Sequence, residues 1–211
     1  MRFKKHLYYV LAAVLAVLIG LGIGYWTFGR QPELTDSSAL LLHPPQPLPA
    51  FGLQADTQSP FTLASLHGHW SFLYFGYTHC PDVCPTTLAD LGKMSEQLVD
   101  LPAAHRPTVY FISVDPKRDT PAVLARYVRY FNADFVGVSG APDQLRLLTH
   151  ALGAAFSYDP PDQSGNYSVE HSSVVFLINP EAEEAAVFTS PIVPLRMADD
   201  YRIILTQHGD R

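Results

Sequence analysis

Three kinds of hydrophobic pattern follow one another along the chain, and the first is an uncharged run at residues 7–28. A run of 22 residues is long enough for a helix to cross the hydrocarbon core of a membrane. The basic residues Arg2, Lys4 and Lys5 precede it, which predicts a cytoplasmic amino terminus and export of the remainder of the chain. Residues 1–30 are therefore predicted to be a single transmembrane anchor.

A cleaved signal peptide is the alternative interpretation of this segment. Signal peptides have a shorter apolar core and end in small residues at the cleavage site. Here the apolar run is longer, and residues 25–28 (Tyr-Trp-Thr-Phe) are bulky. These features favour an uncleaved anchor.

The second pattern, at residues 31–49, has no apolar periodicity and contains five prolines. Such a composition is typical of a semi-extended linker. It predicts a spacer between the anchor and a folded domain at residues 50–211.

The third pattern alternates strand-like apolar runs with helical spacing, and it predicts an α/β sandwich with a mixed sheet. The predicted strands are 51–53, 60–63, 71–77, 108–114, 135–138, 155–158, 167–169, 174–178 and 185–189. The predicted helices are 85–98, 119–131, 141–152 and 194–207. Asn179 and Pro180 join the last two strands through a short turn, so that pair is predicted to be antiparallel. Parallel strands, a closing hairpin and a final helix resemble the thioredoxin architecture, a three-layer sandwich.

Charge is distributed unevenly between the two ends of the chain. Four of the 14 Lys and Arg residues lie in the first 30 positions, where no acid occurs, so the rest carries 10 basic and 20 acidic residues. A domain of that balance does not suit nucleic acid, which requires clustered basic groups. The acidity is interpreted as a contribution to solubility.

The only two cysteines, Cys80 and Cys84, lie where a predicted buried strand passes into a helix. Thiols near a helix N-terminus experience its positive dipole, which favours thiolate. Four residues apart on a first helical turn, the two sulfurs face the same side and can form a disulfide or bind one metal ion. A purely stabilising disulfide is the plainer interpretation, but so short a loop restrains the unfolded chain little.

Two thiolates suit Cu(I) or Zn(II), and a stable site needs a further ligand. His79 is a doubtful candidate because neighbouring strand residues point to opposite faces. His171 precedes the strand at 174–178, and in a thioredoxin-like topology this loop faces the cysteine turn. No proline lies between Pro161 and Pro180, where thioredoxins place a cis-proline, so His171 replaces that feature. Position alone leaves its role as a ligand open.

Four segments together resemble the Sco/SenC family of copper chaperones for cytochrome c oxidase assembly. They are residues 75–85 (FGYTHCPDVCP), 113–121 (SVDPKRDTP), 171–173 (HSS) and 176–180 (FLINP). The resemblance implies a thioredoxin-like fold and a copper site, holding Cu(I), Cu(II) or both, with Cys80, Cys84 and His171 as ligands. It maps the family's acidic residue onto Asp115, either as a group that orients the metal loop or as a plain turn opener.

The resemblance also implies a role and a location. The chain would deliver copper to the dinuclear copper centre of cytochrome c oxidase subunit II, or prepare the thiols of that centre. Its partners would include a thiol reductant and a periplasmic copper donor, because a Cys80–Cys84 disulfide cannot bind copper. It would sit in the bacterial inner membrane with its C-terminal domain in the periplasm. Ligand exchange requires no catalysed bond-making, so a chaperone is expected rather than an enzyme.

Three other functions use the same residues. A thiol:disulfide oxidoreductase specific for oxidase subunit II would use Cys80 or Cys84 as the attacking thiolate. A peroxidase would consume peroxide through one cysteine. A zinc-stabilised interaction module would unfold when its metal is removed. Copper binding is the preferred hypothesis.

Overall fold

The computed structural model describes residues 11, 13–22 and 38–209, and the chain divides into two units, Met1–Thr35 and Asp36–Arg211. In the first unit residues 13–22 are helical, while the rest of the predicted anchor, except residue 11, lies outside the described residues. Within the described ranges, no helix has both the length and the apolar character that a membrane crossing requires.

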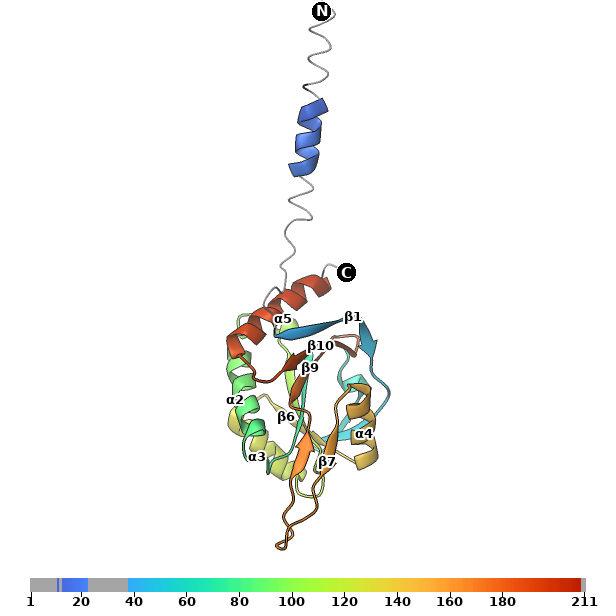
Figure 1. Ribbon diagram of the computed structural model, residues 1–211, viewed down its shortest axis with the longest axis vertical. Helices are drawn as coiled ribbons and strands as arrows, with labels where there is room; N and C mark the ends of the chain where they lie inside the picture. Colours follow the sequence, from blue (N-terminus) through green and yellow to red (C-terminus); the bar gives the residue numbers. More distant parts are fainter. Residues whose placement is uncertain (1–10, 12, 23–37, 210–211) are drawn as a thin grey trace, which may run out of the picture. The chain divides into compact units, whose positions relative to one another are not determined.

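The second unit contains an eight-stranded sheet, a two-stranded hairpin and four α-helices among its described residues (Figure 1). The strands are β1 (Ala39–Pro47), β2 (Gly52–Ala55), β3 (Pro60–Thr62), β4 (Ser71–Gly76), β5 (Thr108–Ser113), β6 (Val136–Ser139), β7 (Phe156–Tyr158), β8 (Val169–His171), β9 (Val174–Ile178) and β10 (Glu183–Thr189). The helices are α2 (Val83–Glu96), α3 (Pro121–Phe131), α4 (Pro142–Ala151) and α5 (Pro194–Gly209), with short 3₁₀ turns η1 (Leu63–Ser65) and η2 (Ala103–His105).

The large sheet is mixed, as predicted, with the strand order β1-β10-β9-β4-β5-β6-β2-β3. Strands β4, β5 and β6 are parallel to one another, while β9 runs antiparallel to β4 and β10 antiparallel to β9. Strands β7 and β8 form a separate antiparallel hairpin. Because β4 and β5 are parallel, the segments after them leave the sheet at one edge.

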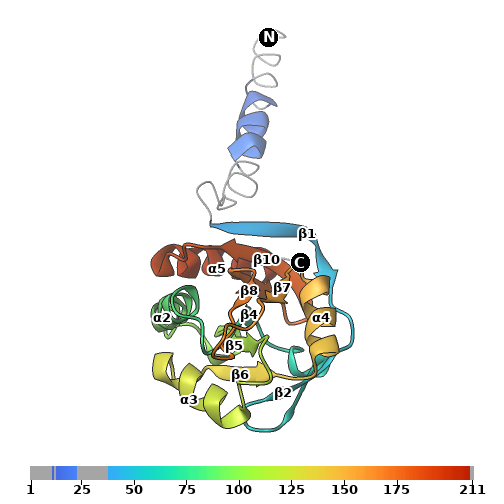
Figure 2. The same ribbon diagram turned by 60° about the horizontal axis from the view of Figure 1, so that its bottom comes forward.

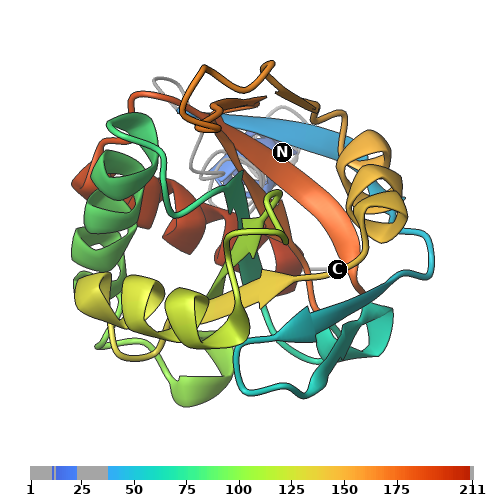
Figure 3. The same ribbon diagram turned by 90° about the horizontal axis from the view of Figure 1, so that it is seen from below.

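Alternation along β4 separates two hydrophobic cores. Phe72 and Tyr74 belong to a cluster that includes α2, α3 and α5, whereas Leu73 and Phe75 belong to a cluster that includes α4. Successive side chains of a strand point to opposite faces, so β4 is buried on both sides. Figure 3 shows α2 and α3 on one side of the sheet and α4 on the other, which gives the three-layer arrangement.

The predicted linker requires a correction, because residues 39–47 form the edge strand β1. This strand pairs antiparallel with β10, with Leu41 opposite Ala186, and lies along it in Figure 2. Prolines are tolerated on an edge strand, and the register shifts between Leu41 and Gln46, across the prolines. Leu48 is also buried in the α4-side core, so the folded domain begins before residue 50.

Candidate metal centre

The two cysteines lie at the corner between β4 and α2. Cys80 is half-buried in the loop after β4, and Cys84, the second residue of α2, is completely buried. The backbone N–H of Cys84 donates to the Sγ of Cys80 over 3.4 Å. Both side chains are free thiols in the structure. The predicted strand-to-helix setting is therefore observed.

His171 reaches this corner from the opposite end of the domain sequence. It is the last residue of β8, where it pairs with Phe156 of β7. Its Nε2 lies 3.2 Å from the Sγ of Cys84. The ligand atoms of Cys80, Cys84 and His171 all lie within 4.8 Å of one another, and among the described residues they form the one such group of three.

The protonation states of this group follow from its hydrogen bonds and its burial. The Nδ1 of His171 lies 3.3 Å from the carbonyl oxygen of Ser172, which only accepts, so Nδ1 carries the proton and Nε2 presents a lone pair. Burial lowers the pKa of His171 and, as the main cause, raises the pKa of Cys84. Without metal, the Cys84 thiol is therefore protonated and donates a hydrogen bond to the Nε2 of a neutral imidazole.

Aromatic rings surround the imidazole of His171. The ring of Tyr74 meets it edge-on at a centroid distance of 6.3 Å, and the ring of Tyr77 does so at 6.0 Å. Tyr74 is fully buried and Tyr77 nearly so. These two rings cover part of the imidazole and restrict its rotation.

Asp115, the acidic residue predicted to orient the metal loop, is completely buried, and its hydrogen bonds go to residues outside the group of three. Its carboxylate accepts a hydrogen bond from the Nε of Arg118 and another, of 2.8 Å, from the hydroxyl of Tyr167. The Arg118 guanidinium stacks 3.8 Å from the Tyr167 ring and lies 5.5 Å from the Tyr77 ring. Asp115 thus reaches His171 through Arg118 and Tyr77, and its orienting role stays a prediction.

A different carboxylate, that of Asp119, binds the cysteine loop directly. It accepts hydrogen bonds from the N–H and the Oγ1 of Thr78, at 2.9 and 2.6 Å, and from the Oγ of Ser113 at 2.5 Å. The sequence pattern offers Asp119 or Thr120 as the N-cap of the next helix, and the cap is Thr120. Asp119 is instead almost completely buried, and it fastens the segment before Cys80 to the end of β5.

The donor set fits a soft metal ion. Two sulfurs and one imidazole nitrogen suit copper or zinc, whereas magnesium and calcium prefer oxygen ligands. His79 lies outside the group of three: its side chain is 55% exposed, and its Nδ1 is 3.8 Å from Asp119. The structure thus places His79 outside this group of ligand atoms.

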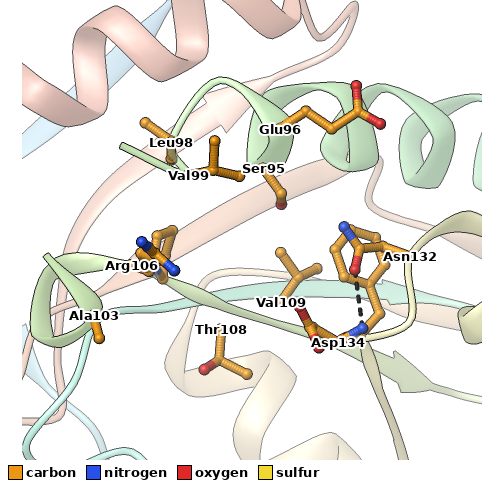
Figure 4. Close-up of a pocket in the computed structure, with 12 residues that line it drawn as sticks. Ser95, Glu96, Leu98, Val99, Ala103, Arg106, Thr108, Val109, Asn132 and Asp134 are labelled. Atoms are coloured by element: carbon orange, nitrogen blue, oxygen red, sulfur yellow. Dashed lines mark hydrogen bonds between the residues drawn. The ribbon is translucent and has the colours of Figure 1, made fainter. Parts of the chain in front are cut away.

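A cavity of about 350 Å³ lies away from these residues, at the edge of the sheet where β5 begins (Figure 4). It is bounded by the end of α2, by Thr108 and Val109, and by the turn where Asn132 accepts a 2.9 Å hydrogen bond from the N–H of Asp134. Its lining contains no cysteine or histidine, so it is not the metal centre.

Comparison with known proteins connects this geometry with copper. The family model described as SCO1/SenC matches residues 43–206. A Stutzerimonas stutzeri protein named for copper binding is 36% identical over 165 residues, which cover 77% of this chain and 79% of that protein. The mitochondrial SCO1 homolog of Homo sapiens is 34% identical over 133 residues, which cover 63% of this chain and 44% of that protein. The chain thus spans less than half of the human relative.

Solved structures give the same connection. Apo Sco1 of Thermus thermophilus superposes with a TM-score of 0.71 at 31% identity, over 80% of this chain and 96% of that one. Yeast Sco1 with copper bound gives a TM-score of 0.69 at 29% identity, over 79% of this chain and 90% of that one. The mixed sheet and its helices therefore match those of solved Sco1 structures, one of which has copper bound.

Proposed function

The chain belongs to the SCO1/SenC family, whose metal is copper, and from this premise we propose that it is a membrane-anchored copper chaperone. It delivers copper to the dinuclear copper centre of cytochrome c oxidase subunit II, or prepares the thiols of that centre. The observation that carries this proposal is the convergence of Cys80, Cys84 and His171 within 4.8 Å.

These three residues would hold the ion as two thiolates and a neutral imidazole. Thiolates favour Cu(I), and imidazole also accepts Cu(II). The Cys84 thiol faces the lone pair of His171, so loading the site expels a thiol proton to solvent. Copper affinity is accordingly lower at acid pH, where protons compete for the same sulfurs.

Loading and release require partners. Outside the cytoplasm the two thiols tend to oxidise, and a reductant must supply two electrons and two protons to regenerate them from the disulfide. A periplasmic donor then supplies copper, and ligand exchange with the oxidase subunit removes it. Because no covalent bond of a substrate is made or broken in that exchange, the protein acts as a chaperone rather than an enzyme.

The anchor and the periplasmic location are part of this proposal. They are supported by the uncharged run at residues 7–28 and by Arg2, Lys4 and Lys5 before it. Tethering raises the effective concentration of the copper site near a membrane-bound acceptor.

Anaerobic copper titration of the detergent-solubilised full-length chain tests the proposal. We expect one Cu(I) per chain, large losses of Cu(I) binding in Cys80→Ser and Cys84→Ser, and a smaller loss in His171→Ala. His79→Ala, which removes a neighbouring imidazole outside the group, is the matched control and should bind normally. Full binding by the cysteine variants would contradict the assignment of the site.

Thiol:disulfide exchange with oxidase subunit II is the second candidate function. It is favoured by the contact of the Cys84 N–H with the sulfur of Cys80, because such donors also stabilise an attacking thiolate. Insulin reduction measured beside copper titration separates the two functions. Strong turnover without copper affinity would favour the reductase, and copper affinity with negligible turnover favours the chaperone.

A further inference from the structure

The β7–β8 hairpin forms one wall of a groove of about 540 Å³, whose lining contains none of the three residues of the copper site. Tyr158 and Tyr167 of the hairpin segment lie on this wall, together with Pro161. Pro116, after β5, and Pro142, at the start of α4, also line the groove. We call these five residues the tyrosine groove. The hairpin loop extends from the body of the domain at the lower end of Figure 1.

The hydroxyl groups of both tyrosines form hydrogen bonds within the protein, so what the two side chains add to the groove is apolar ring surface. Tyr158 donates to the carbonyl oxygen of Val114 over 2.6 Å, and Tyr167 donates to Asp115 over 2.8 Å. The two rings meet edge to face at a centroid distance of 6.1 Å. Aromatic rings fixed beside proline rings make a rigid apolar surface, the kind on which polyproline-II segments dock.

Positive charge borders this surface. Lys117 and Arg146 line the groove and are exposed, and Asp159 is the one acidic residue of its lining. This is an exception in a domain with 10 basic and 20 acidic residues after position 30. Lys117 and Arg146 therefore attract an acidic partner to this edge of the domain.

We propose that the tyrosine groove binds an extended, proline-bearing acidic segment of another protein. Proline rings pack against Tyr158 and Tyr167, while flanking carboxylates pair with Lys117 and Arg146. The groove is next to the copper site, because Arg118 stacks on the Tyr167 ring and lies over Tyr77. A partner held there brings its own metal ligands to the same edge of the domain.

Binding of a defined peptide to the metal-free, thiol-reduced full-length chain tests this proposal independently of copper. The probe is acetyl-Glu-Pro-Pro-Leu-Pro-Glu-amide, measured by calorimetry. One control peptide has glycine in place of each proline, and the other has lysine in place of each glutamate. We expect saturable one-to-one binding of the probe, and about tenfold weaker binding of each control.

Reversing the charges that border the groove tests the proposal most directly. The double variant Lys117→Glu with Arg146→Glu changes two exposed side chains and should lose about tenfold in affinity for the probe while gaining affinity for the lysine peptide. Arg126→Glu, an exposed reversal on α3, is the matched control and should leave both affinities unchanged. Failure of the probe to saturate, equal binding of the glycine peptide, or an unchanged preference in the double variant would overturn the proposal.

Discussion

The Sγ of Cys84 and the Nε2 of His171 lie 3.2 Å apart, although 87 residues separate them in the chain. The hairpin β7–β8 produces this contact, because its register places His171 at the end of β8, beside the corner where α2 begins. Cys80 and Cys84 are close through helical spacing alone. The third ligand thus depends on tertiary structure, and it can be removed without disturbing the cysteine corner.

Replacing His171 is therefore expected to affect the two oxidation states of copper differently. In His171→Ala the two sulfurs still bind Cu(I), whereas Cu(II) loses the ligand that suits it. We expect Cu(II) affinity to fall by more than about 100-fold and Cu(I) affinity to fall less. Competition titrations with each ion measure this, with His69→Ala, whose ring contacts Tyr110, as the control. Equal losses for both ions would contradict the expectation.

Gly76 provides the space that the Cys84 thiol occupies. A Cβ at this last residue of β4 would lie 2.8 Å from the Sγ of Cys84 and 2.7 Å from the Cε2 of Phe111. Gly76→Ala should therefore destabilise the fold by about 1–3 kcal/mol and weaken copper binding, because the sulfur must move. Urea unfolding and copper competition measure the two effects.

Gly52→Ala on β2 is the matched control for Gly76→Ala. The nearest atom to its added Cβ is the Oε1 of Gln144, at an ordinary 3.9 Å. It should change neither stability nor affinity by more than a few tenths of a kcal/mol. A Gly76→Ala protein as stable as this control would show that the strand end yields more easily than the packing implies.

Asp119 is expected to position the copper-binding loop. Asp119→Asn removes a carboxylate oxygen from the cluster with Thr78 and Ser113, and so leaves a buried donor without its acceptor. We expect a loss of about 1–3 kcal/mol in the free energy of unfolding, and a lower copper affinity because Cys80 moves with the loosened segment. Unfolding and competition titrations check both. Asp119→Glu keeps the charge but changes the packing, so normal copper binding in that variant would show that the loop requires the carboxylate rather than its position.

Asp90→Asn tests whether any lost carboxylate has the same effect. Asp90 pairs with Lys93 at 2.9 Å on the surface of α2. Such exposed helical pairs contribute only about 0.3–0.5 kcal/mol. If Asp119→Asn resembled this variant in copper affinity, Asp119 would have no positioning role.

The central elements of the fold were predictable because their signals are local. The apolar runs at 71–77 and 108–114 correspond to β4 and β5 within one residue, since both strands are buried on both faces. The cysteine corner was predictable for the same reason, because a buried strand followed by helical spacing defines it.

Two features depended on non-local pairing and were not predictable in the same way. Strand β1 is held by its partner β10 at the sheet edge, and the prolines in its sequence led to the prediction of a linker. Asp119 carries the local signature of an N-cap, yet its carboxylate accepts hydrogen bonds from Thr78, which lies 41 residues earlier. The proximity of His171 was inferred from the thioredoxin-like topology, and its role as a ligand from the family resemblance, because no local pattern specifies where a hairpin packs.

Glu184 of β10 gives the domain a pH dependence that is independent of copper. Burial raises the pKa of Glu184 from its ordinary value of 4.5 to about 7. An acid whose folded pKa lies above its unfolded pKa holds its proton more tightly in the folded state. Its contribution is therefore complete below pH 4.5 and is lost as the pH rises through about 7. We expect the loss to be on the order of 2 kcal/mol.

Urea unfolding of the copper-free chain at a series of pH values between 4.5 and 8 measures this contribution, and Glu184→Gln should remove the decline without moving the cysteine corner. The amide has the shape of the protonated acid and cannot ionise, so the variant should be more stable than the parent at pH 8 and nearly equal to it at pH 4.5. Glu96→Gln, an exposed residue at the end of α2, is the control and should match the parent at every pH. Parallel curves for Glu184→Gln and the parent would mean that the buried carboxyl ionises without cost.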